Sequence, residues 1–145
     1  MHWPTFFDCL TVAALLLLRF LVMLVFVWSG WGHAKDPEES GKDIGFSAAF
    51  ARLLGVVELL AGLGVGFGVL ARLSALGLMI IMLGAIHRKI FVWKISFWNE
   101  KPAGWHYDLI FFAINLLMFA SGGGAWTLAR AAARLIPPLR WLLNL

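Results

Sequence analysis

Four long apolar runs constrain the fold of this chain more than any other feature. They cover about residues 10–32, 46–70, 73–86 and 105–121, with few charges inside them. A helix needs roughly 20 apolar residues to cross the hydrocarbon core of a bilayer. Apolar residues make up 61% of the chain and charged residues 14%, against about half and a quarter in a soluble domain. The sequence therefore predicts an all-α integral membrane protein, a bundle of four transmembrane helices.

The segments between and after these runs predict how the bundle is organised. Residues 33–45 hold four acids and two lysines and are expected to form a water-facing loop. Residues 87–104 mix basic and aromatic side chains, which is typical of a segment lying in the membrane interface. We expect one transmembrane domain over residues 1–128, and an amphipathic surface helix in the tail, residues 129–145.

Four spans would place both chain ends on one side of the membrane. We call the opposite side, that of residues 33–45 and 87–104, the loop face. Six basic residues lie near the helix ends on the loop face and four on the terminal side. The positive-inside rule therefore favours a cytoplasmic loop face, but by only two charges. Because the basic residues flank membrane spans, the net charge of +4 predicts no nucleic-acid partner.

Cysteine and histidine spacing gives no support for thiol or metal chemistry. Cys9 is the single cysteine, so the chain has neither an internal disulfide nor a dithiol pair. No two histidines have the tight helical spacing of a common metal site. We therefore expect no metal site.

Two ionisable residues, Arg19 and Glu58, lie deep inside predicted spans, where charges are costly and often functional. Counted from the loop of residues 33–45, each lies about 12–13 residues deep, which is roughly 18–20 Å at ~1.5 Å per residue. Equal depth on sequential helices predicts an ion pair shielded from lipid. The pair has two open roles: it locks the bundle, or it lines a cavity that binds a polar headgroup, a quinone or a proton.

Small and polar residues recur on one face of three predicted helices. Glycines beside Glu58 let a neighbouring helix approach closely, so this face is expected to meet protein and not lipid. Together the faces predict a polar seam through an apolar bundle. They consist of Gly55, Glu58, Gly62 and Gly66; of Ser74, Gly77, Gly84 and His87; and of Asp108, Asn115 and Gly122.

The loop-face end of this seam gathers the residues best suited to chemistry. His87 ends the third predicted helix and Asp108 begins the fourth, so the two are expected to meet, with His106 nearby. A carboxylate beside an imidazole suits proton transfer, and these three are the candidate catalytic residues. The expected pocket for a quinone or polar headgroup is walled by Trp105 and Tyr107, with Arg19 and Glu58 deeper inside. The alternative is an interfacial belt of aromatic and histidine side chains that tethers the helix ends.

Several motifs give the chain a resemblance to the DoxX family of small four-helix membrane proteins. They are LLLLRF with Arg19, SGWGHAK at the end of the first helix, GVVELLAGLGVGFGVLARLSAL across the second and third, and GWHYDL at the start of the fourth. The resemblance covers about residues 15–128. The family's G-x-G-R-x-S-L-D type ending is only partly present, because Ala125 and Ala129 stand near the places of its arginine and aspartate.

The resemblance implies a group associated with membrane oxidoreductase complexes. One relative type is similar to the membrane subunit of thiosulfate:quinone oxidoreductase, and others look like accessory proteins of metal handling or oxidative-stress systems. It also implies a bacterial or archaeal cytoplasmic membrane with the chain ends in the cytoplasm, against the charge count.

The leading hypothesis is therefore a membrane subunit of a redox complex, with quinone as its possible cofactor and a protein partner at the loop face. The chain alone has no obvious electron carrier, so whether it is itself an enzyme stays open. The alternatives are a non-catalytic structural or assembly subunit and a binder of a small amphiphile.

Overall fold

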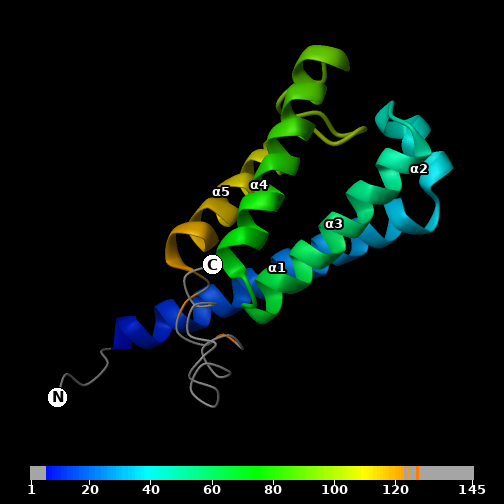
Figure 1. The fold of residues 1–145 in the computed structure, drawn as a ribbon. Helices are drawn as coiled ribbons and strands as arrows, with labels where there is room; N and C mark the ends of the chain where they lie inside the picture. Colours follow the sequence, from blue (N-terminus) through cyan, green and yellow to red (C-terminus); the bar gives the residue numbers. More distant parts are fainter. Residues whose placement is uncertain (1–5, 123, 125–126, 128–145) are drawn as a thin grey trace.

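The computed structural model describes residues 6–122, 124 and 127. This part of the chain contains no strand and confirms the predicted all-α class. Its elements are α1 (Phe6–Lys35), α2 (Pro37–Ile44), α3 (Ala48–Phe67), α4 (Ala71–His87), the π-helical segment η1 (Arg88–Val92) and α5 (His106–Ser121) (Figure 1).

Three helices are long and apolar enough to cross a membrane. They are α1, α3, and α4 continued by η1 as far as Val92. The fourth predicted span, α5, is a shorter apolar helix of 16 residues, about 24 Å long at ~1.5 Å per residue. These helices make the chain a helical membrane bundle in contact with lipid.

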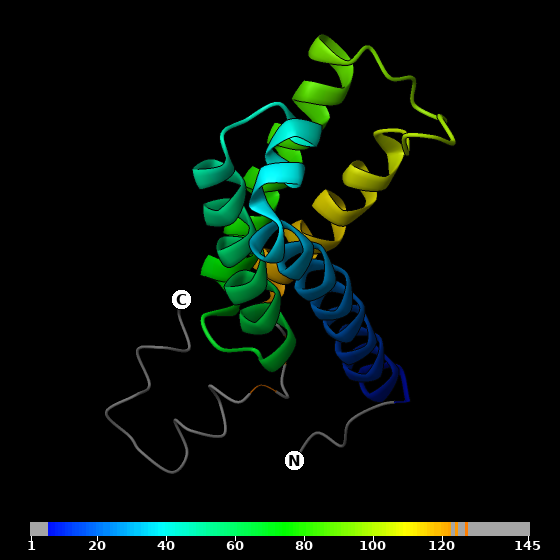
Figure 2. The same ribbon diagram turned by 90° about the vertical axis from the view of Figure 1, so that its right-hand side faces the viewer.

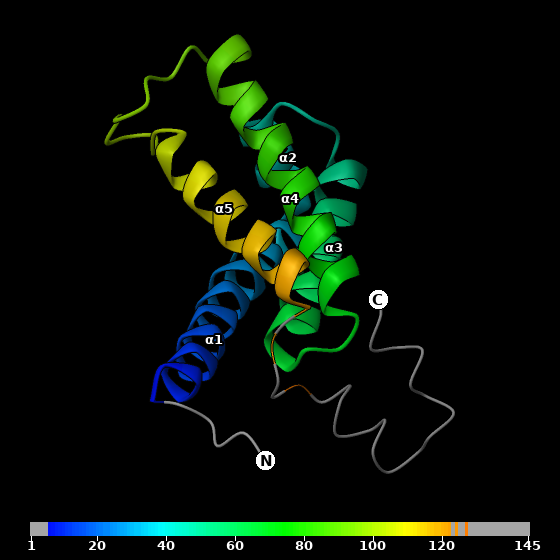
Figure 3. The same cartoon turned by 90° about the vertical axis from the view of Figure 1, so that its left-hand side faces the viewer.

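Two antiparallel hairpins build the bundle. In the first, α1 lies along α3, and in the second, α4 lies along α5 (Figures 1 and 2). The hairpins meet mainly through α3 and α4, which a short turn connects. Helix α1 runs obliquely to α4 and α5 and extends well beyond the turn between α3 and α4 (Figure 3).

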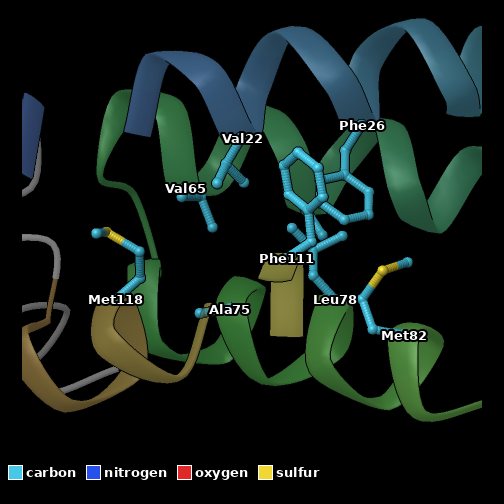
Figure 4. Close-up of a cluster of buried hydrophobic side chains, with 9 residues drawn as sticks. Val22, Phe26, Val65, Ala75, Leu78, Met82, Phe111 and Met118 are labelled. Carbon is cyan, nitrogen blue, oxygen red and sulfur yellow. The ribbon is translucent and has the colours of Figure 1, made fainter. Parts of the chain in front are cut away.

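Apolar side chains from both hairpins form the core between them (Figure 4). At its centre the rings of Phe26 and Phe111 meet edge to face, with their centroids 5.6 Å apart. Large apolar side chains on the outer surface are exposed, as expected for helices that face lipid. The core cluster comprises Val22, Phe26, Ala61, Val65, Ala75, Leu78, Met82, Phe111 and Met118.

The segment predicted as a loop, residues 33–45, is mostly helical. Helix α1 continues to Lys35, and α2 follows directly. The Asp36 side chain accepts a hydrogen bond from the backbone N–H of Glu39 and so caps α2, while Pro37 occupies its first turn. Gly45 ends α2 with a φ of 66°, a left-handed conformation that favours glycine.

The segment predicted to lie at the interface, residues 87–104, begins with the last residue of α4, continues as η1 and then follows a path of turns to the start of α5. The Asn99 side chain donates a hydrogen bond to the carbonyl of Pro102 and steadies this path. The surface helix predicted for residues 129–145 lies outside the described residues.

Candidate functional site

Glycines allow α1 and α3 to approach each other closely. A Cβ added at Gly55 would lie 2.6 Å from the carbonyl oxygen of Gly30, and a Cβ at Gly30 would lie 2.6 Å from that of Gly55. Further along, a Cβ at Gly62 would lie 3.1 Å from the Cβ of Phe26. The glycine face predicted to meet protein therefore packs against α1, backbone against backbone.

The predicted ion pair between Arg19 and Glu58 is wrong. Both side chains are buried, each with 3% of its surface exposed, as predicted. The Glu58 carboxylate, however, lies 3.2 Å from Nδ1 of His33. The Arg19 guanidinium donates hydrogen bonds to the carbonyls of Val65 and Gly66, about two helical turns further along α3.

The error comes from the register of the hairpin. Counting from the loop treated residues 32 and 46 as level with each other. In the structure Gly30 is level with Gly55 instead, so residue 32 lies level with about residue 53, and the count was off by about seven residues, or two helical turns. Helix α2 makes this offset possible, because its eight residues carry the chain past the end of α1 before α3 starts.

Arg19 completes the C-terminal end of α3. Its Nε lies 2.9 Å from the carbonyl oxygen of Val65, and its Nη2 lies 2.6 Å from that of Gly66. Carbonyls in the last turn of a helix have no partner within the helix, and the helix dipole is negative there. A buried guanidinium supplies hydrogen-bond donors to these carbonyls and a positive charge to the negative end of the dipole. Arg19 therefore helps to hold α1 to α3.

His33 is the observed partner of Glu58, a pairing that the sequence did not predict. It lies in the last turn of α1, one helical turn after Gly30, and faces Glu58 across the glycine contact. The partly buried histidine and the buried carboxylate satisfy each other's hydrogen-bonding groups. The correct helix register was the signal needed to find this pair.

A second buried ion pair joins η1 to α5. The Nζ of Lys89 lies 2.7 Å from Oδ2 of Asp108, and both side chains are mostly shielded. Asp108 lies in the first turn of α5, where a negative charge is favoured by the helix dipole. The predicted polar seam is present only in part: Asp108 is buried on α5, but Gly84 and His87 on α4 are exposed, so the predicted inward face of α4 is wrong.

The predicted meeting of His87 with Asp108 is wrong. His87 is exposed, and its ring lies against Phe91 with the ring centroids 4.9 Å apart. The helix changes from α to π geometry directly after His87. Lys89 lies seven residues, or two α-helical turns, after the buried Met82, so the inward face of α4 leads to Lys89 and not to His87.

His106 and Trp105 steady the segment that leads into α5. Nδ1 of His106 donates a hydrogen bond to the carbonyl of Phe97 at 2.6 Å, and the ring packs on Trp98. Trp105 packs edge to face on Phe97. These contacts correspond to the tethering role that the sequence left open for this cluster.

A pocket of about 540 Å³ opens between α1, α4 and α5, and we call it the α1–α5 pocket. Of the residues predicted for a pocket, it holds Tyr107 and Asp108, together with the end of helix α1. Arg19, Glu58 and Trp105 do not line it. Its lining residues are Leu24, Val25, Phe26, Trp28, Ser29, Met82, Tyr107, Asp108 and Phe111.

The α1–α5 pocket is apolar on its walls and polar at one side. The hydroxyls of Ser29 and Tyr107 and the carboxylate of Asp108 supply its hydrogen-bonding groups. Leu24 and Trp28, which are exposed on the outer surface of α1, form its rim. Such a pocket suits an amphiphile that arrives from the lipid phase with a small polar head.

Fold and site together define a helical membrane protein with one tightly packed hairpin and a pocket beside the other. The chain belongs to the DoxX family, whose match covers residues 14–93. It is 32% identical over 146 aligned residues to an uncharacterized membrane protein of Mycobacterium tuberculosis, covering 91% of this chain and 89% of that one. No solved structure shows significant similarity. The family resemblance predicted from the sequence motifs is confirmed.

The family match includes the α1–α3 hairpin and η1, but it ends before α5 begins. Arg19, Glu58 and Lys89 therefore lie inside the matched region, and Asp108 lies outside it. The ion pair of Lys89 with Asp108 joins the matched part of the chain to the unmatched part.

Proposed function

We propose that this DoxX protein is a membrane subunit of a redox complex and that its α1–α5 pocket binds a quinone. The observation that carries the proposal is the composition of that pocket: apolar walls open to lipid, two hydroxyls, and a buried carboxylate paired with Lys89. The proposed setting is the cytoplasmic membrane of a bacterium or archaeon, with both chain ends in the cytoplasm.

A quinone matches the pocket in both of its parts. Its isoprenoid tail stays in the lipid beside Leu24 and Trp28, and its ring enters between the apolar walls. The carbonyl oxygens of the ring need hydrogen-bond donors, which Tyr107 and Ser29 supply. Lys89 lies beside Asp108 and adds a charged donor at the same end.

Reduction of the quinone to a quinol takes two electrons and two protons. The electrons would come from the redox centre of a partner protein, because this chain holds one exposed cysteine, Cys9, and no dithiol. The protons would reach the two carbonyl oxygens through the Asp108 and Lys89 side chains. These groups can exchange protons with water at the loop face.

The loop face is the proposed docking surface for that partner. Helix α2 exposes charged side chains there, among them Glu38, Glu39, Lys42 and Asp43. The turns of residues 93–104 lie at the same end of the bundle (Figure 1). A mixed charged surface of this kind suits a soluble partner that associates with the membrane.

A non-catalytic structural role is the second candidate, because Arg19 and Glu58 are both used within the α1–α3 hairpin. A third candidate keeps the same pocket but gives it another small amphiphile. Quinone content separates the candidates. Protein purified in mild detergent is extracted with organic solvent, and bound quinone is measured by mass spectrometry.

Added quinone then tests the site directly. Leu24→Trp fills the α1–α5 pocket, and its matched control, Leu60→Trp, fills an apolar groove of about 550 Å³ between α3 and α4. We expect Leu24→Trp to weaken quinone binding about tenfold, the loss of roughly 1.4 kcal/mol, and Leu60→Trp to leave it unchanged. Equal binding by both variants and the original protein would refute the quinone site.

A further inference from the structure

The Arg88 guanidinium lies against two aromatic rings from different segments. Its Cζ lies 4.2 Å from the centroid of the Phe46 ring and 5.3 Å from that of Trp93. Its Nη2 lies so close to Gly45 that a Cβ added there would be 2.7 Å from it. The turn between α2 and α3, together with η1, therefore fixes the position of this cation.

This cation has no anionic partner among the described residues. The acids of the neighbouring helix α2 form no ion pair with Arg88, although they are close in sequence to Gly45. The Nε of Arg88 is buried and has no hydrogen-bond partner among these residues. Burial of a charge without a partner is costly, and aromatic rings offset only part of the cost.

We propose that Arg88 binds the phosphate group of a phospholipid headgroup. A guanidinium that is stacked on rings keeps its N–H groups at its edge, and two parallel N–H groups match two phosphate oxygens. An oxyanion at that edge would supply the missing counter-charge. The chemistry recognised is a phosphate oxyanion, and the membrane is its nearest source.

The depth of Arg88 in the bundle agrees with a headgroup site. It lies 17 residues after Ala71, where α4 begins on the opposite side, and this is a rise of about 25 Å at ~1.5 Å per residue. The hydrocarbon core is ~30 Å thick, so the backbone of Arg88 ends about 5 Å short of the opposite boundary, a distance that a long arginine side chain can span toward the headgroups. Phe91 and Trp98, both exposed, lie close by in sequence, and such aromatic side chains are typical of this level.

The site is separate from the α1–α5 pocket. Arg88 and Lys89 are neighbours in η1, but Lys89 is paired with Asp108 while Arg88 lies against Phe46 of the other hairpin. A bound phosphate would therefore connect η1 with the start of α3 at the loop face. This role does not depend on quinone binding.

Lipid titration tests the proposal. Delipidated protein in a non-ionic detergent is titrated with phosphatidylglycerol, and separately with inorganic phosphate, and bound adducts are counted by native mass spectrometry. We expect Arg88→Gln to weaken phosphatidylglycerol binding about tenfold and Arg88→Lys to weaken it less, because lysine keeps the charge but loses the paired donors. The matched control is Arg52→Gln, which removes an exposed charge from the start of α3, and it should bind as the original protein does.

Phe46→Leu keeps every charge and removes one ring. We expect it also to weaken lipid binding, with helix content unchanged by circular dichroism, so the proposal stays testable if Arg88→Gln fails to fold. Unchanged lipid binding by Arg88→Lys and Phe46→Leu would overturn the proposal. Arg88-dependent binding of inorganic phosphate as tight as that of the lipid would overturn the lipid as the source.

Discussion

The two hairpins of this bundle are joined in different ways. Between α1 and α3, glycines bring the backbones together, and the buried polar side chains of Arg19 and Glu58 are hydrogen-bonded across the contact. Around α4 and α5, bulky side chains such as Phe111 and Met82 keep the helices apart and leave a pocket beside α1.

The difference shows why a buried charge in a membrane is not by itself a functional site. Arg19 and Glu58 are both buried, yet both hold α1 and α3 together. The pair of Lys89 and Asp108 lies nearer the loop face, and Asp108 also lines the α1–α5 pocket. A polar group beside open space is available to a ligand, and one enclosed between close backbones is not.

The largest expected effect comes from adding one methyl group to the close hairpin. Gly55→Ala would place its Cβ 2.6 Å from two backbone atoms, so the helices must separate. We expect the free energy of unfolding to fall by about 3 kcal/mol, the upper range for overpacking, as measured by titration with a denaturing detergent.

Gly77→Ala and Gly84→Ala are the matched controls, because a Cβ at either position meets no atom within 4 Å. Alanine is the better helix former by about 1 kcal/mol, so these variants should be as stable as the original protein or slightly more so. If Gly55→Ala is as stable as these two variants, the α1–α3 hairpin is not more closely packed than the α4–α5 hairpin.

Removing the guanidinium at α3 should have the next largest effect. Arg19→Ala leaves the carbonyls of Val65 and Gly66 without this donor, at a cost of about 2 kcal/mol for buried groups. Arg19→Lys should cost about half as much stability, because a lysine ammonium cannot reproduce the two parallel hydrogen bonds of the guanidinium. Equal stability of Arg19→Ala and the original protein would remove Arg19 from the contact between α1 and α3.

A smaller effect separates the observed pairing from the one that the sequence suggested. A double-mutant cycle of His33→Ala with Glu58→Ala should give a coupling of about 1 kcal/mol. The cycle of Arg19→Ala with Glu58→Ala should give a coupling below about 0.5 kcal/mol, as for residues that do not touch. A reversed order of the two coupling energies would contradict the register of α1 against α3.

The smallest expected effect concerns the start of α3. Ser47 accepts a hydrogen bond from the backbone N–H of Phe50 through its side chain, so Ser47→Ala should cost about 1 kcal/mol. Thr11→Ala on the exposed face of α1 removes only a bond to a carbonyl within the same helix and should change stability by less than about 0.5 kcal/mol. Thermal unfolding in detergent compares the two.

Much of the fold follows from the sequence, since apolar runs and glycine faces act locally and are visible as patterns. Helix α2 was missed because its charges suggested a loop. The sequence nevertheless marks its boundaries: Asp36 and Pro37 are typical of a helix start, and Gly45 is typical of a helix end. That omission also shifted the depth count that paired Arg19 with Glu58.

The candidate site was predicted less well than the fold. Asp108 and Tyr107 were placed in a pocket at the end of α1, where they lie, but His87 was chosen as the partner of Asp108 in place of Lys89. The choice assumed that the face of α4 with Gly77, Gly84 and His87 turns inward, whereas Gly84 and His87 are exposed. The buried face is instead the apolar one of Leu78 and Met82, which reaches Lys89 two helical turns after Met82.

The length of α1 makes the protein responsive to the thickness of its bilayer. The apolar run of α1, residues 10–32, spans about 35 Å, which is longer than a hydrocarbon core of ~30 Å. A helix with such positive hydrophobic mismatch fits by tilting, and α1 does lie obliquely to α4 and α5 (Figure 3). Helix α1 also forms one wall of the α1–α5 pocket, so the acyl-chain length of the lipids should change the width of the pocket. A thicker membrane lets α1 stand more upright, and a thinner one tilts it further.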